Sequence, residues 1–299
     1  MKKRKTLQDL TIKDNFLFGA VMCVEENCKG FLEMALGFSI SSVVVSKEKS
    51  MIYHPEYKGV RLDIYAEDEN HTHYNVEMQV KKKTTLGKRS GYYHGQMVME
   101  ALASGEDYET LSDSFVIFVC DFDPFGEHLY CYTFGNECKE NKNVKLDDGS
   151  CTIFLSTKGE NEEKVPQELV RFLKFVTADL EESEEDFQDE LVKRFQETIH
   201  SIKTDREMGE RYMIFEEMLR EEKQEGRLEG RIEGRIEATR EAILELLEDL
   251  GEISEKLQDR IAGLETLEDL KALHKLAARA ASLQAFEEDM ERYLQSKEK

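Results

Sequence analysis

The last proline of the chain, Pro166, separates two regions with different sequence patterns. Before residue 160, short apolar runs of strand length, such as "SFVIFVC" and "CTIFLS", alternate with helical patterns. Beyond Pro166 the apolar residues have helical spacing throughout, and proline suits the first turn of a helix. The sequence therefore predicts an α/β domain over residues 1–160, followed by an all-α C-terminal extension.

The all-α extension divides into three parts. Residues 165–225 contain two amphipathic stripes, and residues 226–237 carry a four-residue EGRx repeat. Residues 238–299 have the Leu-rich periodicity of a small C-terminal helical domain, with Gly251 and Gly263 as the expected helix breaks.

In the EGRx repeat, glutamate, glycine and arginine each recur every four residues. Like charges are therefore neighbours along a helix, and each glycine costs about 1 kcal/mol relative to alanine. An isolated helix of this sequence is expected to be weak. Two interpretations stay open. The helix pairs with a second helix, as in a coiled coil or homo-oligomer, with Glu columns facing Arg columns, or it is a solvated connector.

The formal net charge of −22 is unevenly distributed. Residues 1–135 hold 15 Lys and Arg against 20 Asp and Glu, whereas the remaining residues hold 26 against 43. Such an acidic chain is not expected to coat nucleic acid by charge alone, but its first half stays compatible with a nucleic-acid site.

The six cysteines lack the spacing of a zinc site or a CxxC motif, which indicates reduced thiols in a cytoplasmic protein. The basic N-terminus is not followed by an apolar stretch, so a signal peptide is not expected. No run approaches about 18 apolar residues, and a membrane span is therefore not expected either.

Three helical patterns and one hairpin are expected in the first half. "TLQDLTIKDNFLFGAVM" and "CKGFLEMALGF" are helical, with a break at Gly30 and an end at Gly37. "LGKRSGYYHGQMVMEALASG" predicts a helix that ends at Gly105. The runs "GVRLDIYAE" and "YNVEMQV" predict strands, and the polar segment "DENHTH" between them predicts a β-hairpin.

Two acids of this hairpin are expected to face each other. If the hairpin is centred near Asn70, Asp63 lies opposite Glu77, and strand alternation puts Gln79 on the same face as Glu77. Facing carboxylates repel unless a cation lies between them, and Mg²⁺ favours one or two carboxylates together with waters and phosphate oxygens. The pattern is compatible with a metal held by Asp63 and Glu77, but the spacing of these residues is by itself a weak signal. The alternative is a solvent-facing hairpin with ordinary surface acids.

A metal at this position would orient a water for attack on a phosphodiester. Gln79 would position that water through its carboxamide, although it can neither act as a base nor supply positive charge. A set of nearby cations would hold the DNA backbone: Lys81, Lys82, Lys83, Lys88 and Arg89. The sequence contains no P-loop, dinucleotide fingerprint or nucleophile elbow, so no organic cofactor is expected.

The hairpin "LDIYAEDENHTHYNVEMQV" resembles the D…ExK hairpin of the PD-(D/E)xK nuclease superfamily, in the variant that has ExQ. Further segments are similar to its recombination-promoting nuclease/transposase branch: "KDNFLFGAVM", "KRSGYYHGQMVMEALASGEDYETL", "CDFDPFG…YTF" and "DDGSCTIFLSTKG". Together they span roughly residues 8–160 in the family's order, and the "EGRLEGRIEG" repeat is typical of the family's tail.

This resemblance implies a PD-(D/E)xK-like mixed sheet flanked by helices, with Asp63 and Glu77 as the metal-binding catalytic acids. Gln79 stands at the position of the superfamily lysine, which usually helps to activate the nucleophile. A glutamine there implies a weaker or differently organised active site, or a member that binds without cutting.

Three further residues match family positions outside the hairpin. Asp14, in "KDNFLF", matches a position on the first helix and would complete the acidic site. Arg89 and Tyr93 match the family's "R…Y" on the helix after the hairpin, where they would contact the substrate or support the hairpin.

The function expected from the resemblance is a Mg²⁺-dependent DNA endonuclease, with Mn²⁺ as a substitute, associated with recombination or mobile elements. Two alternatives stay open. One is a binding module of the same fold that has lost cleavage, and the other is an interaction protein that assembles through its helical tail.

Overall fold

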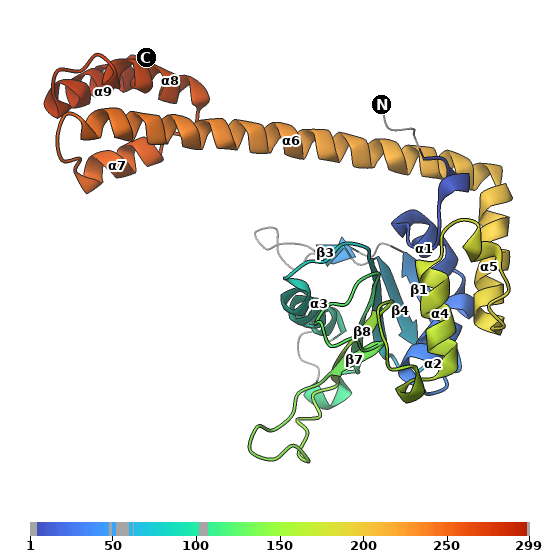
Figure 1. The fold of residues 1–299 in the computed structure, drawn as a ribbon. Helices are drawn as coiled ribbons and strands as arrows, with labels where there is room; N and C mark the ends of the chain where they lie inside the picture. The colour runs from blue at the N-terminus through green and yellow to red at the C-terminus, as the bar shows by residue number, and fades with distance from the viewer. Residues whose placement is uncertain (1–4, 48–49, 52–59, 62, 102–106, 298–299) are drawn as a thin grey trace. The chain divides into compact units, whose positions relative to one another are not determined.

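The computed structural model describes residues 5–47, 50–51, 60–61, 63–101 and 107–297 (Figure 1). The chain forms two compact units, Met1–Met213 and Ile214–Lys299, and each is treated by itself below. The expected helix end at Gly105 lies outside the described residues.

The first unit is built on a six-stranded mixed sheet. In spatial order its strands are β1 (Val43–Lys47), β4 (Ile64–Asp68), β5 (His73–Gln79), β6 (Ser114–Cys120), β8 (Ser150–Ser156) and β7 (Cys131–Phe134). The pairs β5·β6 and β6·β8 are parallel, and the other pairs are antiparallel. A separate two-stranded sheet joins β2 (Ser50–Met51) to β3 (Val60–Arg61). The predicted mixed α/β sheet is therefore confirmed.

Helices cover both faces of this sheet (Figure 1). One face carries α3 (Leu86–Ala101), and the other carries α1 (Asn15–Met22), α2 (Glu25–Leu36), α4 (Gln167–Thr177) and α5 (Glu190–Thr204). Short 3₁₀ turns are η1 (Leu7–Asp9), η2 (Tyr108–Thr110), η3 (Glu162–Lys164) and η4 (Glu182–Glu184). Because both faces are covered, the central parallel strand β6 is almost continuously apolar and buried.

The helices α4 and α5 belong to the same compact unit as the sheet. Phe172 of α4 lies between Phe31 of α2 and Phe195 of α5, with ring centroids 5.3 and 5.8 Å away. The two amphipathic stripes that follow Pro166 therefore pack against the first helices of the chain, although the sequence pattern sets them apart from residues 1–160.

The predicted helix break at Gly30 is wrong, because α2 continues through this residue. A Cβ atom at Gly30 would lie 2.8 Å from Leu191 Cδ1 and 2.9 Å from Arg194 Nη2. The glycine thus allows α5 to approach α2 closely. Gly37 does end α2, as predicted, in the left-handed conformation with φ of 78°.

The second unit is helical. It contains most of α6 (Arg206–Glu248), followed by α7 (Glu255–Ala262), α8 (Leu267–Ala277) and α9 (Leu283–Lys297). The C-terminal part of α6 and the three later helices share one apolar core: Ile243, Leu247, Leu257, Ile261, Leu270, Leu273, Ala277, Phe286 and Met290.

The EGRx repeat lies within the continuous helix α6, and residues 225–235 are exposed. Within the described ranges, no atom outside the helix lies within 4 Å of a Cβ position at the three repeat glycines. None of the helices in these ranges combines the length and apolar character that crossing a bilayer requires.

The close approach at Gly30 predicts a cost for a bulky side chain there, because the side chains of Leu191 and Arg194 would have to move. Gly30→Leu should lower the free energy of unfolding by about 1–3 kcal/mol, because overpacking against Leu191 and Arg194 outweighs the better helix propensity of leucine. Gly91→Leu is the matched control, since Gly91 is an exposed residue of α3 with nothing within 4 Å of its Cβ position. Urea unfolding followed by circular dichroism measures both variants, and equal effects would contradict the packing argument.

Candidate active site

The carboxyl group of Glu77 lies inside the first unit. Glu77 is on the central strand β5, and its side chain is 1% exposed. In the β4–β5 hairpin, Ile64 pairs with Val76 and Tyr65 with Asn75. Asp63 directly precedes β4, and continuing this register by one residue would set it opposite Glu77. Burial of Glu77 argues against the alternative of ordinary surface acids on a solvent-facing hairpin.

Gln79 and Arg89 bind the same oxygen of Glu77. Gln79 Nε2 donates to Glu77 Oε2 over 3.2 Å, and Arg89 Nη2 donates to this atom over 2.6 Å. Arg89 Nη1 also donates to Gln79 Oε1 over 3.4 Å. The structure therefore brings Glu77, Gln79 and Arg89 into one hydrogen-bonded cluster, which joins β5 to the first turn of α3.

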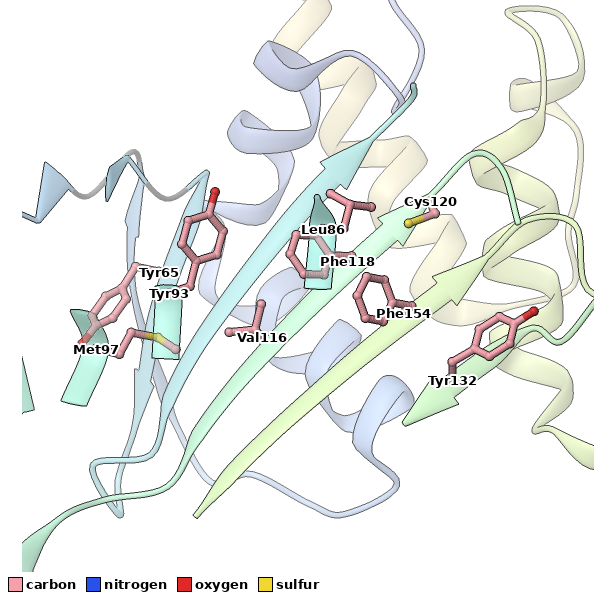
Figure 2. Packing of buried hydrophobic residues seen from close by; sticks show 9 residues of the cluster. All are labelled: Tyr65, Leu86, Tyr93, Met97, Val116, Phe118, Cys120, Tyr132 and Phe154. Carbon is pink, nitrogen blue, oxygen red and sulfur yellow. The ribbon is translucent and has the colours of Figure 1, made fainter. Parts of the chain in front are cut away.

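Tyr93 holds Arg89 in this position from one helical turn further along α3. Arg89 Nε donates to the Tyr93 hydroxyl over 3.0 Å, and the guanidinium carbon lies 5.3 Å from the centroid of the Tyr93 ring. Tyr93 belongs to the apolar cluster between α3 and the sheet, where its ring stacks on Phe118 at 6.4 Å (Figure 2). The arginine is thus anchored by a side chain that is itself fixed by packing.

The second carboxylate oxygen of Glu77, Oε1, differs from Oε2 in its hydrogen bonding. Glu77 Oε1 is buried and accepts no hydrogen bond of ordinary geometry from the described part of the chain, and the same holds for the polar atoms of the Asn75 side chain. A buried carboxylate oxygen without a partner is costly, so such atoms call for a cation or a water molecule. The unpaired oxygen lies on the strand pair that also carries Asp63.

Burial, together with the charge of Asp63, raises the pKa of Glu77 to about 7, although the Arg89 charge acts in the opposite direction. Burial also lowers the pKa of Arg89, but its hydrogen bond to Tyr93 and the charges of Glu77 and Asp63 raise it on balance. Asp63 therefore lies close enough to act electrostatically on both side chains.

The two carboxylates fit a divalent metal with few protein ligands. Within the described residues, no group of three or more His, Cys, Asp or Glu side chains is arranged to hold a metal ion. Mg²⁺ does not require such a cage, since it commonly binds one or two carboxylates and completes its shell with water and phosphate oxygens. Asp63 and Oε1 of Glu77 would supply this donor set.

The lysines expected to contact DNA lie on the surface next to this cluster. Lys81, Lys82 and Lys83 are exposed in the loop that leaves the carboxyl end of β5, and Lys88 is exposed on the first turn of α3. Gln79 is the last residue of β5, directly before this loop, and Arg89 lies on the first turn of α3, next to Lys88. The surface cations therefore flank the buried site.

Asp14 is the N-cap of α1, where its side chain accepts a hydrogen bond from the Phe16 N–H over 3.1 Å. The neighbouring Lys13 forms an ion pair with Asp121 at 3.5 Å, and the Asp121 N–H donates to the Gln79 carbonyl. The start of α1 therefore lies at the same end of the sheet as Gln79.

Sequence reasoning missed a polar network beneath α3. His94 Nδ1 is 2.8 Å from Ser114 Oγ, and His94 Nε2 is 3.0 Å from Thr152 Oγ1, which also contacts Ser90. Burial lowers the pKa of His94 to about 4, so the imidazole is neutral at pH 7. Ser90 and His94 lie one helical turn apart, and this spacing next to Arg89 is the only sequence signal of their role in holding α3 to the sheet.

The raised pKa of Glu77 predicts a pH-dependent stability difference in metal-free protein. Between about pH 4.5 and 7 the folded state keeps the Glu77 proton while the unfolded state releases it, so the free energy of unfolding falls as pH rises through this window. Relative to Glu77→Gln, the wild type should lose about 3 kcal/mol across the window.

Urea unfolding in the presence of a chelator at pH 4.5, 6 and 8 measures this difference. The exposed Glu109→Gln serves as the control and should follow the wild type at each pH. Parallel curves for wild type and Glu77→Gln would contradict the effect of burial.

A family model described as PD-(D/E)XK nuclease family transposase matches residues 13–226. No curated protein and no solved structure matches the chain.

Proposed function

The chain belongs to the PD-(D/E)XK nuclease family transposases, and from this we propose that it is a Mg²⁺-dependent endonuclease that hydrolyses phosphodiester bonds in DNA. We propose that it acts in DNA recombination or in the movement of mobile genetic elements. The observation that carries the proposal is the buried carboxylate of Glu77. Its Oε1 atom accepts no hydrogen bond of ordinary geometry from the described residues, and the hairpin register, continued by one residue, would set Glu77 opposite Asp63.

In this proposal Asp63 and Glu77 hold the metal, and Mn²⁺ can replace Mg²⁺. When bound, the ion supplies an activated water and neutralises charge that develops on the phosphate. Gln79 orients the attacking water through its amide, whose own orientation is fixed by hydrogen bonds to Glu77 and from Arg89. Because the amide is uncharged, Gln79 cannot take the proton itself.

The remaining residues position the substrate and the site. The surface lysines Lys81, Lys82, Lys83 and Lys88 contact phosphates of the DNA backbone on either side of the cleaved bond. Asp14 supports the acidic site from the start of α1, and Tyr93 supports it by holding Arg89.

A second candidate is a nuclease-fold protein with weak or no cleavage, which binds DNA or assembles into a homo-oligomer through its helices. Gln79 favours this candidate, because it supplies no positive charge where most of the superfamily has a lysine. The exposed EGRx columns of α6 favour the assembly component, since Glu and Arg columns are complementary between two copies.

Cleavage should depend on both hairpin acids. Asp63→Asn and Glu77→Gln are expected to lower Mg²⁺-dependent nicking of supercoiled plasmid at least about 100-fold, the scale of removing one preorganised electrostatic interaction with a transition state. Glu67→Gln is the matched control, because strand alternation puts Glu67 on the same face of the hairpin as Asp63. Among the described residues, its carboxylate forms an ion pair only with His71 at the hairpin tip.

This experiment separates the two candidate functions. Full activity in Asp63→Asn would exclude the hairpin as the active site. A wild type that nicks with neither Mg²⁺ nor Mn²⁺ would favour the second candidate.

DNA binding should show the contribution of the loop lysines. Replacing Lys81, Lys82 and Lys83 together by alanine is expected to reduce the slope of log K against log salt by about 0.9 for each phosphate that the protein no longer neutralises. The control replaces Lys139, Lys142 and Lys145, which are exposed in the segment between β7 and β8. Fluorescence anisotropy with labelled duplex measures both slopes, and an equal change in the two triple variants would argue against a specific role of the loop lysines.

A further inference from the structure

One cation of the chain lies where a metal ion would also have to bind. Arg89 donates to Glu77 Oε2 over 2.6 Å and to Gln79 Oε1 over 3.4 Å, and its side chain acts electrostatically on Asp63 as well. A single guanidinium therefore interacts with both acids of the hairpin site, Glu77 by an ion pair and Asp63 through its charge.

A divalent cation and this guanidinium would repel each other. Both would lie within a few ångströms of one carboxylate, and Glu77 is 1% exposed, so their mutual repulsion is weakly screened by solvent. Metal binding through Glu77 is therefore expected to weaken or break the hydrogen bond from Arg89. The released arginine needs another anionic partner.

We propose that Arg89 alternates between two partners: it neutralises Glu77 in the metal-free protein, and on metal binding it transfers to a phosphate oxygen of the DNA. This inference rests on the proposed nuclease function. In this scheme Arg89, on α3, supplies the positive charge that the uncharged Gln79 on β5 cannot supply.

The geometry of α3 allows this movement. Arg89 lies on the first turn of the helix, and its side chain is 29% exposed, so the guanidinium already reaches the surface that carries Lys88. Both Nε and Nη2 of Arg89 donate to the Tyr93 hydroxyl. Because the guanidinium is planar, it must turn as one body about this hydroxyl when it moves from Glu77 toward a phosphate. A guanidinium binds phosphate through two parallel hydrogen bonds, which suits this role. Tyr93 acts as a positioning residue for the turn.

The test measures metal affinity and cleavage in the same variants. Mn²⁺ binding to the full chain, followed by electron paramagnetic resonance at about pH 8.5 where Glu77 is ionised, should be about tenfold tighter in Arg89→Met, because the competing cation is gone. Lys88→Met is the matched control: it removes a neighbouring positive charge without any contact to Glu77, and its affinity should change less than about twofold.

Cleavage should move in the opposite direction. At saturating Mn²⁺, Arg89→Met is expected to lower kcat for plasmid nicking about 100-fold, since the arginine no longer binds the phosphate. Arg89→Lys should keep part of the rate. Tyr93→Phe should bind Mn²⁺ more tightly than wild type, because Arg89 is then held less firmly.

Tighter Mn²⁺ binding with slower cleavage supports the proposal, because a purely structural role would weaken both. Unchanged or weaker Mn²⁺ binding in both Arg89→Met and Tyr93→Phe, with wild type binding normally, would overturn it. A wild type whose Mn²⁺ binding is the same as that of Asp63→Asn would instead overturn the proposed nuclease function and, with it, this inference.

Discussion

Burial of one carboxyl group, that of Glu77, governs the arrangement of the first unit. A carboxylate on the middle of a sheet that is covered on both faces loses its hydration, and it must gain partners inside the protein. Arg89 and Gln79 donate hydrogen bonds to it, whereas the like charge of Asp63 opposes its ionisation, and the aromatic cluster around Tyr93 fixes the arginine. The position of α3 over the sheet thus depends both on the ion pair between Arg89 and Glu77 and on apolar packing.

The polar network beneath α3 secures the same geometry from further along the helix. Ser90 and His94 contact Thr152 and Ser114, whose strands β8 and β6 are the neighbours beyond β5. Because His94 is neutral at physiological pH, these hydrogen bonds carry no charge into the apolar cluster that Figure 2 shows. The helix is fixed in register along its length, and Arg89 can move only by turning its own side chain.

The sequence predicts the hairpin well because strand geometry has a period of two and the tip is a short polar segment. The pairing of residues around Asn70 and the shared face of Glu77 and Gln79 both follow from that period. Alternation does not tell whether a polar face meets solvent or a helix, so the burial of Glu77 was not predictable. The hydrogen bond between Arg89 and Glu77 spans an irregular lysine-rich loop, and such a loop has no pattern from which its path follows.

The sequence pattern predicts that a segment is an amphipathic helix, but it does not predict which other element the helix packs against. The stripes on α4 and α5 indicate burial, yet periodicity does not say that their partners are α1 and α2. The prediction at Gly30 is wrong for the same reason, since a glycine that breaks a helix and a glycine that admits a neighbouring helix have the same sequence signature.

The exposed repeat in α6 also bears on the length of this helix. Its four-residue units are near-identical, and the gain or loss of one unit would change the length of the helix by about 6 Å. Residues 225–235 contribute to neither hydrophobic core, so such a change leaves the folding of both units intact. The length of α6 can therefore change at this point without altering the residues of the sheet or its acids.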